Sequence, residues 1–212
     1  AIVDSVTDSI YKEKYTYVRV CGPSIASPNG NWYFGKWAGI KFAASGPYKD
    51  LGPYKNVFPV QINHQEGSIS QSNFRGQLLF YGGTDRDDSL NFRIYDRNYK
   101  EMFGSPILGD YTAGLGTVVV PFINDTNRYY IFHLIGYNNQ SIRAWNPAQN
   151  YIRYSIVDMS YTSPTKGRVT TKNILLKDSL NHRIKTESEG IIMIKRKGTL
   201  GYWVVFEGID SA

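Results

Sequence analysis

The sequence has a single cysteine, Cys21, among its 212 residues. A disulfide within the chain needs two cysteines, and cysteine-based metal sites need several, so both are excluded. A catalytic thiol must be exposed and easily ionised, and no feature of the sequence indicates this for Cys21. We interpret it as an apolar filler in a buried or half-buried position.

Long apolar runs are also missing. No segment approaches the roughly 20 apolar residues of a membrane-spanning helix, and the start, AIVDSVTDSI, lacks the charged region and apolar core of a signal peptide. Apolar residues do not recur at about 3.6-residue intervals over three turns. We therefore predict no transmembrane segment and little helix.

Enzyme motifs are absent as well. His64, His133 and His182 lie far apart and follow no metal-binding spacing. The chain has no G-x-S-x-G nucleophile motif and no phosphate-binding glycine fingerprint. These absences favour a non-enzymatic protein over an enzyme.

A β-hairpin pattern occurs three times in the chain. Each copy has a short strand-like run, a polar turn with glycine or asparagine, and a second, more apolar run: residues 68–72 and 77–81, 117–122 and 128–134, and 191–195 and 201–207. Recurrence at roughly 50 to 75 residues indicates a β-repeat architecture. Third strands are predicted at 91–96 and 151–158, and a fourth at 169–176.

Apolar residues stand next to one another in the second strand of each hairpin: LLFY, YYIF and YWVV. This predicts burial on both faces, whereas the third strands alternate and should keep one wet face. Trp32 and Trp203 lie inside predicted strands, so we assign both to the core.

The predicted fold is all-β, and most resembles a partial or split β-propeller of antiparallel four-stranded blades. A β-sandwich is the alternative. Residues 1–30 are predicted to be an N-terminal extension, and residues 31–212 a propeller-like domain of about two and a half blades. Because propellers have about four to eight blades, the chain is either part of a larger propeller or closes by pairing with something else.

Several segments resemble, in order, the N-terminal half of the large secreted β-propeller proteins of bacteria that use type IX secretion. The segments are NWYFGKWAGIKF at 31–42, EGSIS through GQLLFYGG at 66–83, IYDRN at 94–98 and YSIVDM at 154–159. The resemblance implies a propeller fold and a surface or extracellular location. It implies no catalytic residues.

Two groups of residues are candidate binding sites. Asp85, Asp87 and Asp88, called the acidic loop below, supply carboxylates of the kind that calcium prefers, although the loop lacks the glycine and glutamate of a helical calcium site. Three aromatic side chains outside regular strands are candidate platforms for stacking on a ligand such as a sugar: Trp37, Trp145 and Tyr137. No other cofactor is predicted.

The net charge of +6 would permit nucleic-acid binding, but only Lys195-Arg196-Lys197 forms a basic run, at the predicted tip of the third hairpin. A solvated turn explains that run better. The predicted partner is a protein or an additional chain that completes the sheet assembly, or a glycan. The strand at 201–207 should then be covered by the N-terminal strand at 15–20 or by a partner subunit, because a bare apolar edge promotes aggregation.

The leading functional hypothesis is a non-enzymatic surface or secreted module that binds a protein or glycan partner. The alternative is a carbohydrate-active propeller hydrolase or lyase that uses carboxylates such as Asp85, Asp88, Asp110 or Asp158. Fold alone supports such an enzyme only weakly.

Overall fold

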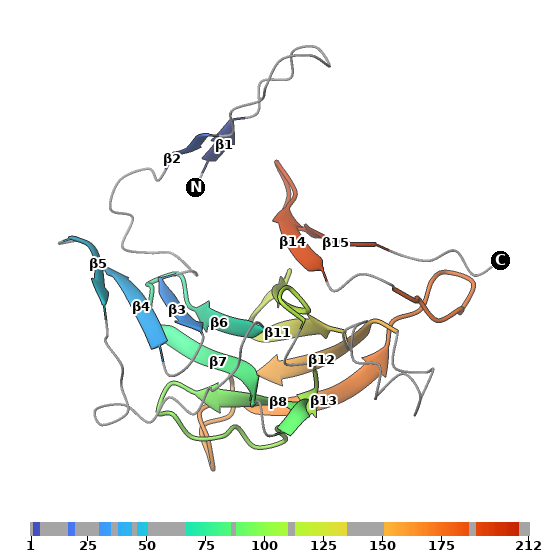
Figure 1. The fold of residues 1–212 in the computed structure, drawn as a ribbon, viewed down its shortest axis with the longest axis horizontal. Helices are drawn as coiled ribbons and strands as arrows, with labels where there is room; N and C mark the ends of the chain where they lie inside the picture. Colours follow the sequence, from blue (N-terminus) through green and yellow to red (C-terminus); the bar gives the residue numbers. More distant parts are fainter. Residues whose placement is uncertain are drawn as a thin grey trace.

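The chain forms antiparallel β-structure, shown in Figure 1. The computed structural model describes residues 2–4, 17–19, 30–34, 38–43, 46–50, 67–85, 88–109, 113–134, 151–186 and 190–207. These residues form strands and no helix, so the predicted all-β class is confirmed. Within this described part, no helix has the length and apolarity needed to cross a membrane.

Two four-stranded antiparallel sheets form the centre of the molecule. The first contains, in chain order, β6 (Ser68–Ser72), β7 (Leu78–Asp85), β8 (Asp88–Asp96) and β9 (Ile107–Leu108). The second contains β10 (Thr117–Phe122), β11 (Asp125–His133), β12 (Arg153–Asp158) and β13 (Arg168–Leu175). The first two predicted hairpins and both predicted third strands are therefore present.

Smaller sheets stand on either side. A three-stranded sheet contains β3 (Asn31–Phe34), β4 (Ala38–Ala43) and β5 (Gly46–Asp50). The third predicted hairpin is formed by β14 (Ile191–Lys195) and β15 (Tyr202–Phe206). Near the N-terminus, β1 (Ile2–Asp4) pairs with β2 (Tyr17–Arg19). The strands β2 and β15 belong to different sheets, so the structure does not pair the N-terminal strand with β15; cover by a partner subunit, the alternative, stays a prediction.

The turn of the first hairpin shows how sequence sets the strand boundaries. The side-chain oxygen Oδ1 of Asn73 accepts hydrogen bonds from the backbone N–H groups of Arg75 (2.9 Å) and Gln77 (3.0 Å). Gly76 has φ 72°, a left-handed conformation that glycine adopts without steric cost. This asparagine–glycine pair ends β6 and starts β7 within a few residues.

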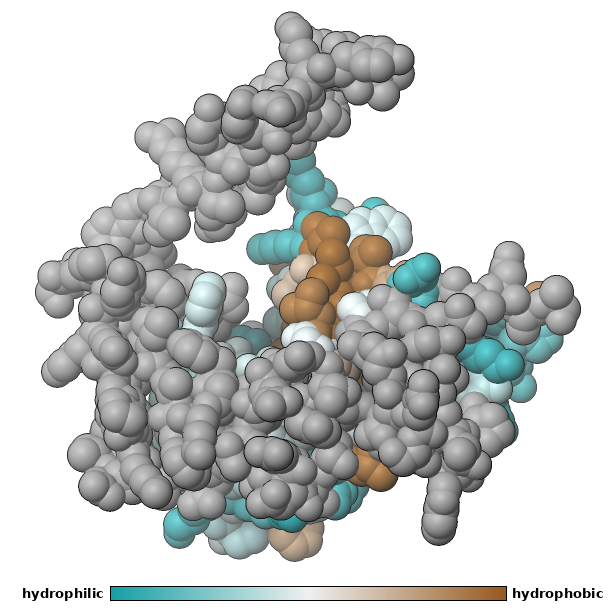
Figure 2. All heavy atoms as spheres, viewed as in Figure 1, coloured by the Kyte–Doolittle hydropathy of each residue, from teal (hydrophilic) through white to brown (hydrophobic). Residues whose placement is uncertain are grey.

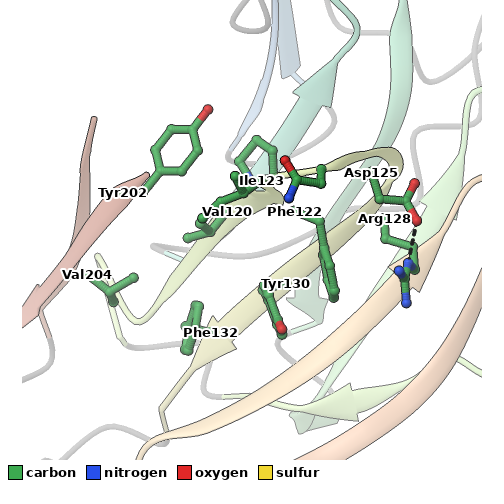
Figure 3. A pocket seen from close by; sticks show the side chains of 11 residues that line it. Val120, Phe122, Ile123, Asp125, Arg128, Tyr130, Phe132, Tyr202 and Val204 are labelled. Carbon is green, nitrogen blue, oxygen red and sulfur yellow. Dashed lines mark hydrogen bonds and ion pairs between the residues drawn. The ribbon is translucent and has the colours of Figure 1, made fainter. Parts of the chain in front are cut away.

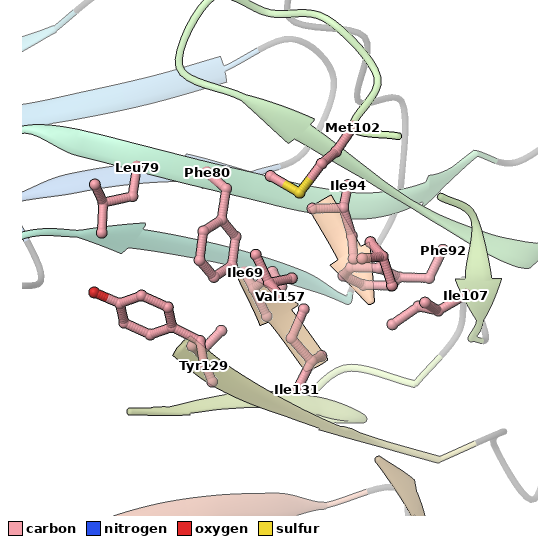
Figure 4. Close-up of a cluster of buried hydrophobic side chains, with 12 residues drawn as sticks. Ile69, Leu79, Phe80, Phe92, Ile94, Met102, Ile107, Tyr129, Ile131 and Val157 are labelled. Carbon is pink, nitrogen blue, oxygen red and sulfur yellow. The ribbon is translucent and has the colours of Figure 1, made fainter. Parts of the chain in front are cut away.

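A core lies between the two four-stranded sheets (Figure 4). Phe80 and Ile94 of the first sheet meet Ile131 and Val157 of the second, and all four side chains are fully buried. The Phe80 and Tyr129 rings meet edge to face, with centroids 5.5 Å apart. The face-to-face contact joins the two four-stranded sheets.

The same kind of contact continues on both sides. Tyr33 of β3 stacks on Tyr81 of β7, with ring centroids 4.8 Å apart. On the other side, a third cluster joins the sheet β10–β13 to the hairpin β14–β15, through side chains that include Phe132 and Val204. Four sheets therefore pack in series, and the two in the middle bury residues on both faces.

The first strands of successive sheets also touch one another: β3 contacts β6, β6 contacts β10, and β10 contacts β14. At the opposite edge, β9 contacts β13. The first strands of the sheets therefore lie together at one edge of the series. The last strands of the two central sheets lie at the opposite edge.

Two core assignments made from the sequence are wrong. Trp32 is 50% exposed and Trp203 is 57% exposed. Side chains alternate between the two faces of a strand. Asn31 and Tyr33 of β3, and Tyr202, Val204 and Phe206 of β15, face a neighbouring sheet, so Trp32 and Trp203 point the other way. The prediction that YWVV is buried on both faces fails for the same reason.

Candidate functional site

The strongest candidate site is a pocket between the hairpin β10–β11 and the strand β15 (Figure 3). Its volume is about 420 Å³, within the range of roughly 300–1,000 Å³ typical of ligand pockets. It is lined mainly by aromatic and aliphatic side chains: Val120, Pro121, Phe122, Ile123, Asn124, Asp125, Arg128, Tyr130, Phe132, Tyr202 and Val204. We call it the aromatic pocket.

Strand pairing sets the aromatic wall of this pocket. Val120 pairs with Tyr130, and Val118 pairs with Phe132, so alternate residues of both strands share the face toward β15. The register shifts between Pro121 and Phe122. After this bulge, the Phe122 ring lies parallel to the Tyr130 ring, with centroids 4.0 Å apart and an interplanar angle of 8°. The stacking covers the facing sides of the two rings and fixes their orientation in the pocket wall.

A charged pair also lines the aromatic pocket. Arg128 Nε donates to Asp125 Oδ2 over 2.6 Å, and the Arg128 guanidinium lies 4.7 Å from the centre of the Phe122 ring. The pKa of the Asp125 carboxyl is lowered, first by the backbone N–H of Asn127 and next by Arg128. Asp125 is therefore a carboxylate at neutral pH, and the pocket carries both an anionic acceptor and a cationic donor beside its aromatic wall.

The candidate residues predicted from the sequence fall mostly outside the described residues. Trp37, Trp145, Tyr137, Asp87 and Asp110 all lie there. The backbones of Asp85 and Asp88 are described and pair with each other, at the end of β7 and the start of β8. The predicted stacking platforms and the calcium site in the acidic loop thus stay predictions.

Asp158, a candidate for the alternative enzyme, has a local structural role. Its Oδ1 accepts a hydrogen bond from the backbone N–H of Ser160, 2.9 Å away, which holds the turn after β12. The described residues contain no group of three or more His, Cys, Asp or Glu side chains able to hold a metal ion.

Asp96 is a buried carboxylate whose oxygens are already occupied. Oδ1 accepts from the backbone N–H groups of Asn98 (2.8 Å) and Lys100 (3.1 Å), and Oδ2 accepts from that of Lys166 (2.9 Å). The first two bonds form the turn after β8, and the third crosses to the loop before β13. Asp96 therefore has a structural role, in which its carboxylate joins the turn after β8 to the loop before β13.

His133 and Ser155 form a pair that resembles part of a catalytic triad. His133 Nε2 lies 3.0 Å from Ser155 Oγ. Both side chains are fully buried, however, and Ser155 Oγ also accepts the backbone N–H of Asn173. A substrate cannot reach either group, so the pair belongs to the core.

Burial lowers the pKa of His133 to about 3, and the positive charge of Arg153 acts in the same direction. The backbone of Leu108 raises the pKa and offsets only part of this shift. His133 is consequently neutral at physiological pH.

Sequence reasoning missed the aromatic pocket. It interpreted YYIF as core on both faces, and Tyr129 and Ile131 do enter the core. Tyr130 and Phe132 point the other way, toward β15. The available signal was the aromatic residue Phe122, two positions after Val120, which is the strand partner of Tyr130.

Comparison of the chain with protein-family models, curated proteins and solved structures found no match.

Proposed function

We propose that this protein is a non-enzymatic binding module of the β-propeller type, which engages a protein or glycan partner through the aromatic pocket. The observation that carries the proposal is the pocket itself. A rigid aromatic wall lies beside an arginine–aspartate pair, in a space of about 420 Å³.

The serial packing of sheets supports a propeller over a β-sandwich. A sandwich has two sheets, each with one face in the core. Here the sheets β6–β9 and β10–β13 each contribute to clusters on both faces. Blades that follow one another around an axis bury their sheets in this way, with the first strands side by side.

The chemistry of the aromatic pocket suits a ring-shaped group. Tyr130 and Tyr202 line the pocket and offer aromatic surface to a sugar ring or to an aromatic or proline side chain of a protein. Asp125 accepts hydrogen bonds from hydroxyl or amide groups, and Arg128 donates them. The described carboxylates Asp96 and Asp158 are bound to backbone N–H groups, which supports binding rather than hydrolysis.

A surface or extracellular location is part of this proposal. It rests on the resemblance of the segments at 31–42, 66–83, 94–98 and 154–159 to secreted propeller proteins. Protease treatment of intact source cells tests it, because a surface protein is cleaved and an internal one is protected.

The binding proposal is tested with a glycan panel and with pull-down from surface extracts, using wild type and Tyr130→Ala. Loss of one aromatic stacking surface is expected to weaken binding by about tenfold, or roughly 1.4 kcal/mol. Phe74→Ala is the matched control, since Phe74 is an exposed aromatic residue in the turn after β6. Binding that is equal in all three proteins refutes the role of the pocket.

The same glycan panel separates the binder from the enzyme. A hydrolase or lyase would release shortened products over time, whereas a binder returns each glycan unchanged. Product formation that is lost on replacing a single aspartate with asparagine would overturn the non-enzymatic proposal.

A further inference from the structure

Arginine side chains contact aromatic rings at several places on the surface. Figure 2 shows hydrophobic residues gathered over the hairpin β14–β15, where the exposed Arg196 lies 4.9 Å from the centre of the Trp203 ring. The exposed Arg75 lies 5.3 Å from the centre of the Phe74 ring. Such exposed cation–π contacts leave the charge in water and contribute little.

Arg168, the first residue of β13, is held differently. Its guanidinium lies 4.6 Å from the centre of the Phe103 ring and 4.5 Å from the centre of the Tyr161 ring. Arg168 is half-buried, whereas the two rings are 53% and 39% exposed. We call these three residues the arginine cluster. None of them lines the aromatic pocket, so the cluster is a separate feature of the surface.

The backbone fixes both rings of the arginine cluster. The carbonyl oxygen of Phe103 accepts the N–H of Val169 over 2.9 Å, and that of Tyr161 accepts the N–H of Gly167 over 2.9 Å. Gly104 has φ 91°, and a Cβ there would lie 2.3 Å from the Val169 carbonyl oxygen. Glycine is therefore needed for the chain beside Phe103 to approach β13, and the cluster is in place before any ligand binds.

The guanidinium of Arg168 has no acceptor within the described part of the chain. It takes part in none of the ion pairs there, and its Nε is buried without a hydrogen-bond partner. Buried donors are nearly always paired in folded proteins. Arginine forms its strongest pairs with oxyanions, to which it donates two parallel hydrogen bonds in the plane of the guanidinium. An oxyanion is the group that this site lacks.

Asp158 decides which oxyanion fits best. It is the cross-strand partner of Arg168 in the register of β12 and β13, so both side chains lie on one face of the sheet. Its Oδ1 accepts the N–H of Ser160, and it forms no ion pair with Arg168. This nearby negative charge repels a doubly charged phosphate more than a singly charged carboxylate.

We propose that the arginine cluster is a binding site for a carboxylate group of a ligand. The carboxylate accepts hydrogen bonds from the terminal nitrogens of Arg168, and the exposed rings of Phe103 and Tyr161 contact the group that carries it. A sugar acid and an acidic amino-acid side chain share this chemistry. The site is independent of the proposed binding at the aromatic pocket.

The test is a titration of the full chain with sodium acetate, followed through the arginine Nε–H signals in the proton–nitrogen NMR spectrum. The Arg168 signal, assigned by its loss in Arg168→Lys, should shift saturably with a dissociation constant of about 10–100 mM. The Arg75 signal is the internal control, because its guanidinium is exposed beside Phe74. It should move no more with acetate than with sodium chloride at equal ionic strength.

Variants and further probes define the site. Phe103→Ala should weaken acetate binding about two- to fivefold, because one of the two rings that orient Arg168 is lost, and Phe103→Tyr should retain it. Asp158→Asn, which can still accept the Ser160 N–H, should tighten binding by up to about fivefold. Glucuronate and N-acetylglutamate distinguish a sugar acid from an acidic side chain, since the carrier that contacts a ring binds more tightly than acetate.

Three results would overturn the inference. The first is an Arg168 signal that moves no more with acetate than the Arg75 signal does. The second is inorganic phosphate binding about tenfold more tightly than acetate, which contradicts a carboxylate site. The third is a shift of the ligand-free Arg168 signal in Asp158→Asn as large as the shift at acetate saturation, because Asp158 would then be the partner of Arg168 in solution.

Discussion

Replacing Asp96 with alanine is expected to destabilise the fold far more than its single charge suggests. The carboxylate is fully buried and accepts three backbone hydrogen bonds, from Asn98, Lys100 and Lys166. Hydrogen bonds to charged groups contribute about 1.5–3 kcal/mol each, and a buried donor left without a partner costs about 1–3 kcal/mol. These terms do not add fully, so we expect a loss of about 3–5 kcal/mol.

That loss is a large fraction of the roughly 5–15 kcal/mol that separates folded from unfolded domains. For a chain of this length it corresponds to a fall in Tm of about 10 °C. The stability of Asp96→Asn should lie between those of wild type and Asp96→Ala. Its amide oxygen can still accept the hydrogen bonds of the turn, but its NH₂ group is a donor and cannot accept the Lys166 N–H.

The assay is urea unfolding followed by tryptophan fluorescence, with Tm measured in parallel. Asp158→Ala is the matched control, since its carboxylate accepts the Ser160 N–H at an exposed turn. It should cost about 1 kcal/mol or less. If Asp96→Ala and Asp158→Ala lose equal stability, the anchoring role of Asp96 is refuted.

Three further results are expected. His133 has a pKa of about 3 in the folded protein, against an ordinary value of 6.5, so on acidification the unfolded state binds this proton before the folded state does. The free energy of unfolding should therefore fall by up to about 1.4 kcal/mol per pH unit from pH 6.5 down to about 3. The variant His133→Gln should lack this pH dependence, and His182→Gln should keep it. Gly82→Ala should lower Tm sharply, because its Cβ would lie 2.6 Å from Phe92 Cε1, whereas Gly201→Ala meets only ordinary contacts and should change Tm little. Chelation by EDTA should shift Tm by no more than about 1 °C, and a calcium-dependent rise in Tm would instead support the predicted site in the acidic loop.

The hairpins were predictable because their signals are local. Asn73 and Gly76 set one turn through contacts within four residues. The alternation in β12 likewise predicted its one wet face, and its burial does alternate. Such patterns depend on neighbours in the chain, which a sequence displays directly.

The remaining features depend on contacts between distant segments. YYIF and YWVV are similar as sequences, but Tyr130 has a following sheet beside it, while the outward face of Trp203 has none among the described residues. The aromatic pocket needs Tyr202 to lie opposite Phe122, and the Asp96 bond to Lys166 spans 70 positions. A single sequence does not show which distant residues contact one another.

The serial packing of sheets determines the order in which parts of the molecule unfold locally. Each sheet gains its tertiary contacts from its immediate neighbours, as in a one-dimensional chain of coupled units. A unit at an end has one coupling partner and opens more readily than a unit flanked by two. Amide protons of β14–β15 should therefore exchange before those of β10–β13, and the first of these openings would uncover the aromatic pocket while the central pair of sheets stays closed.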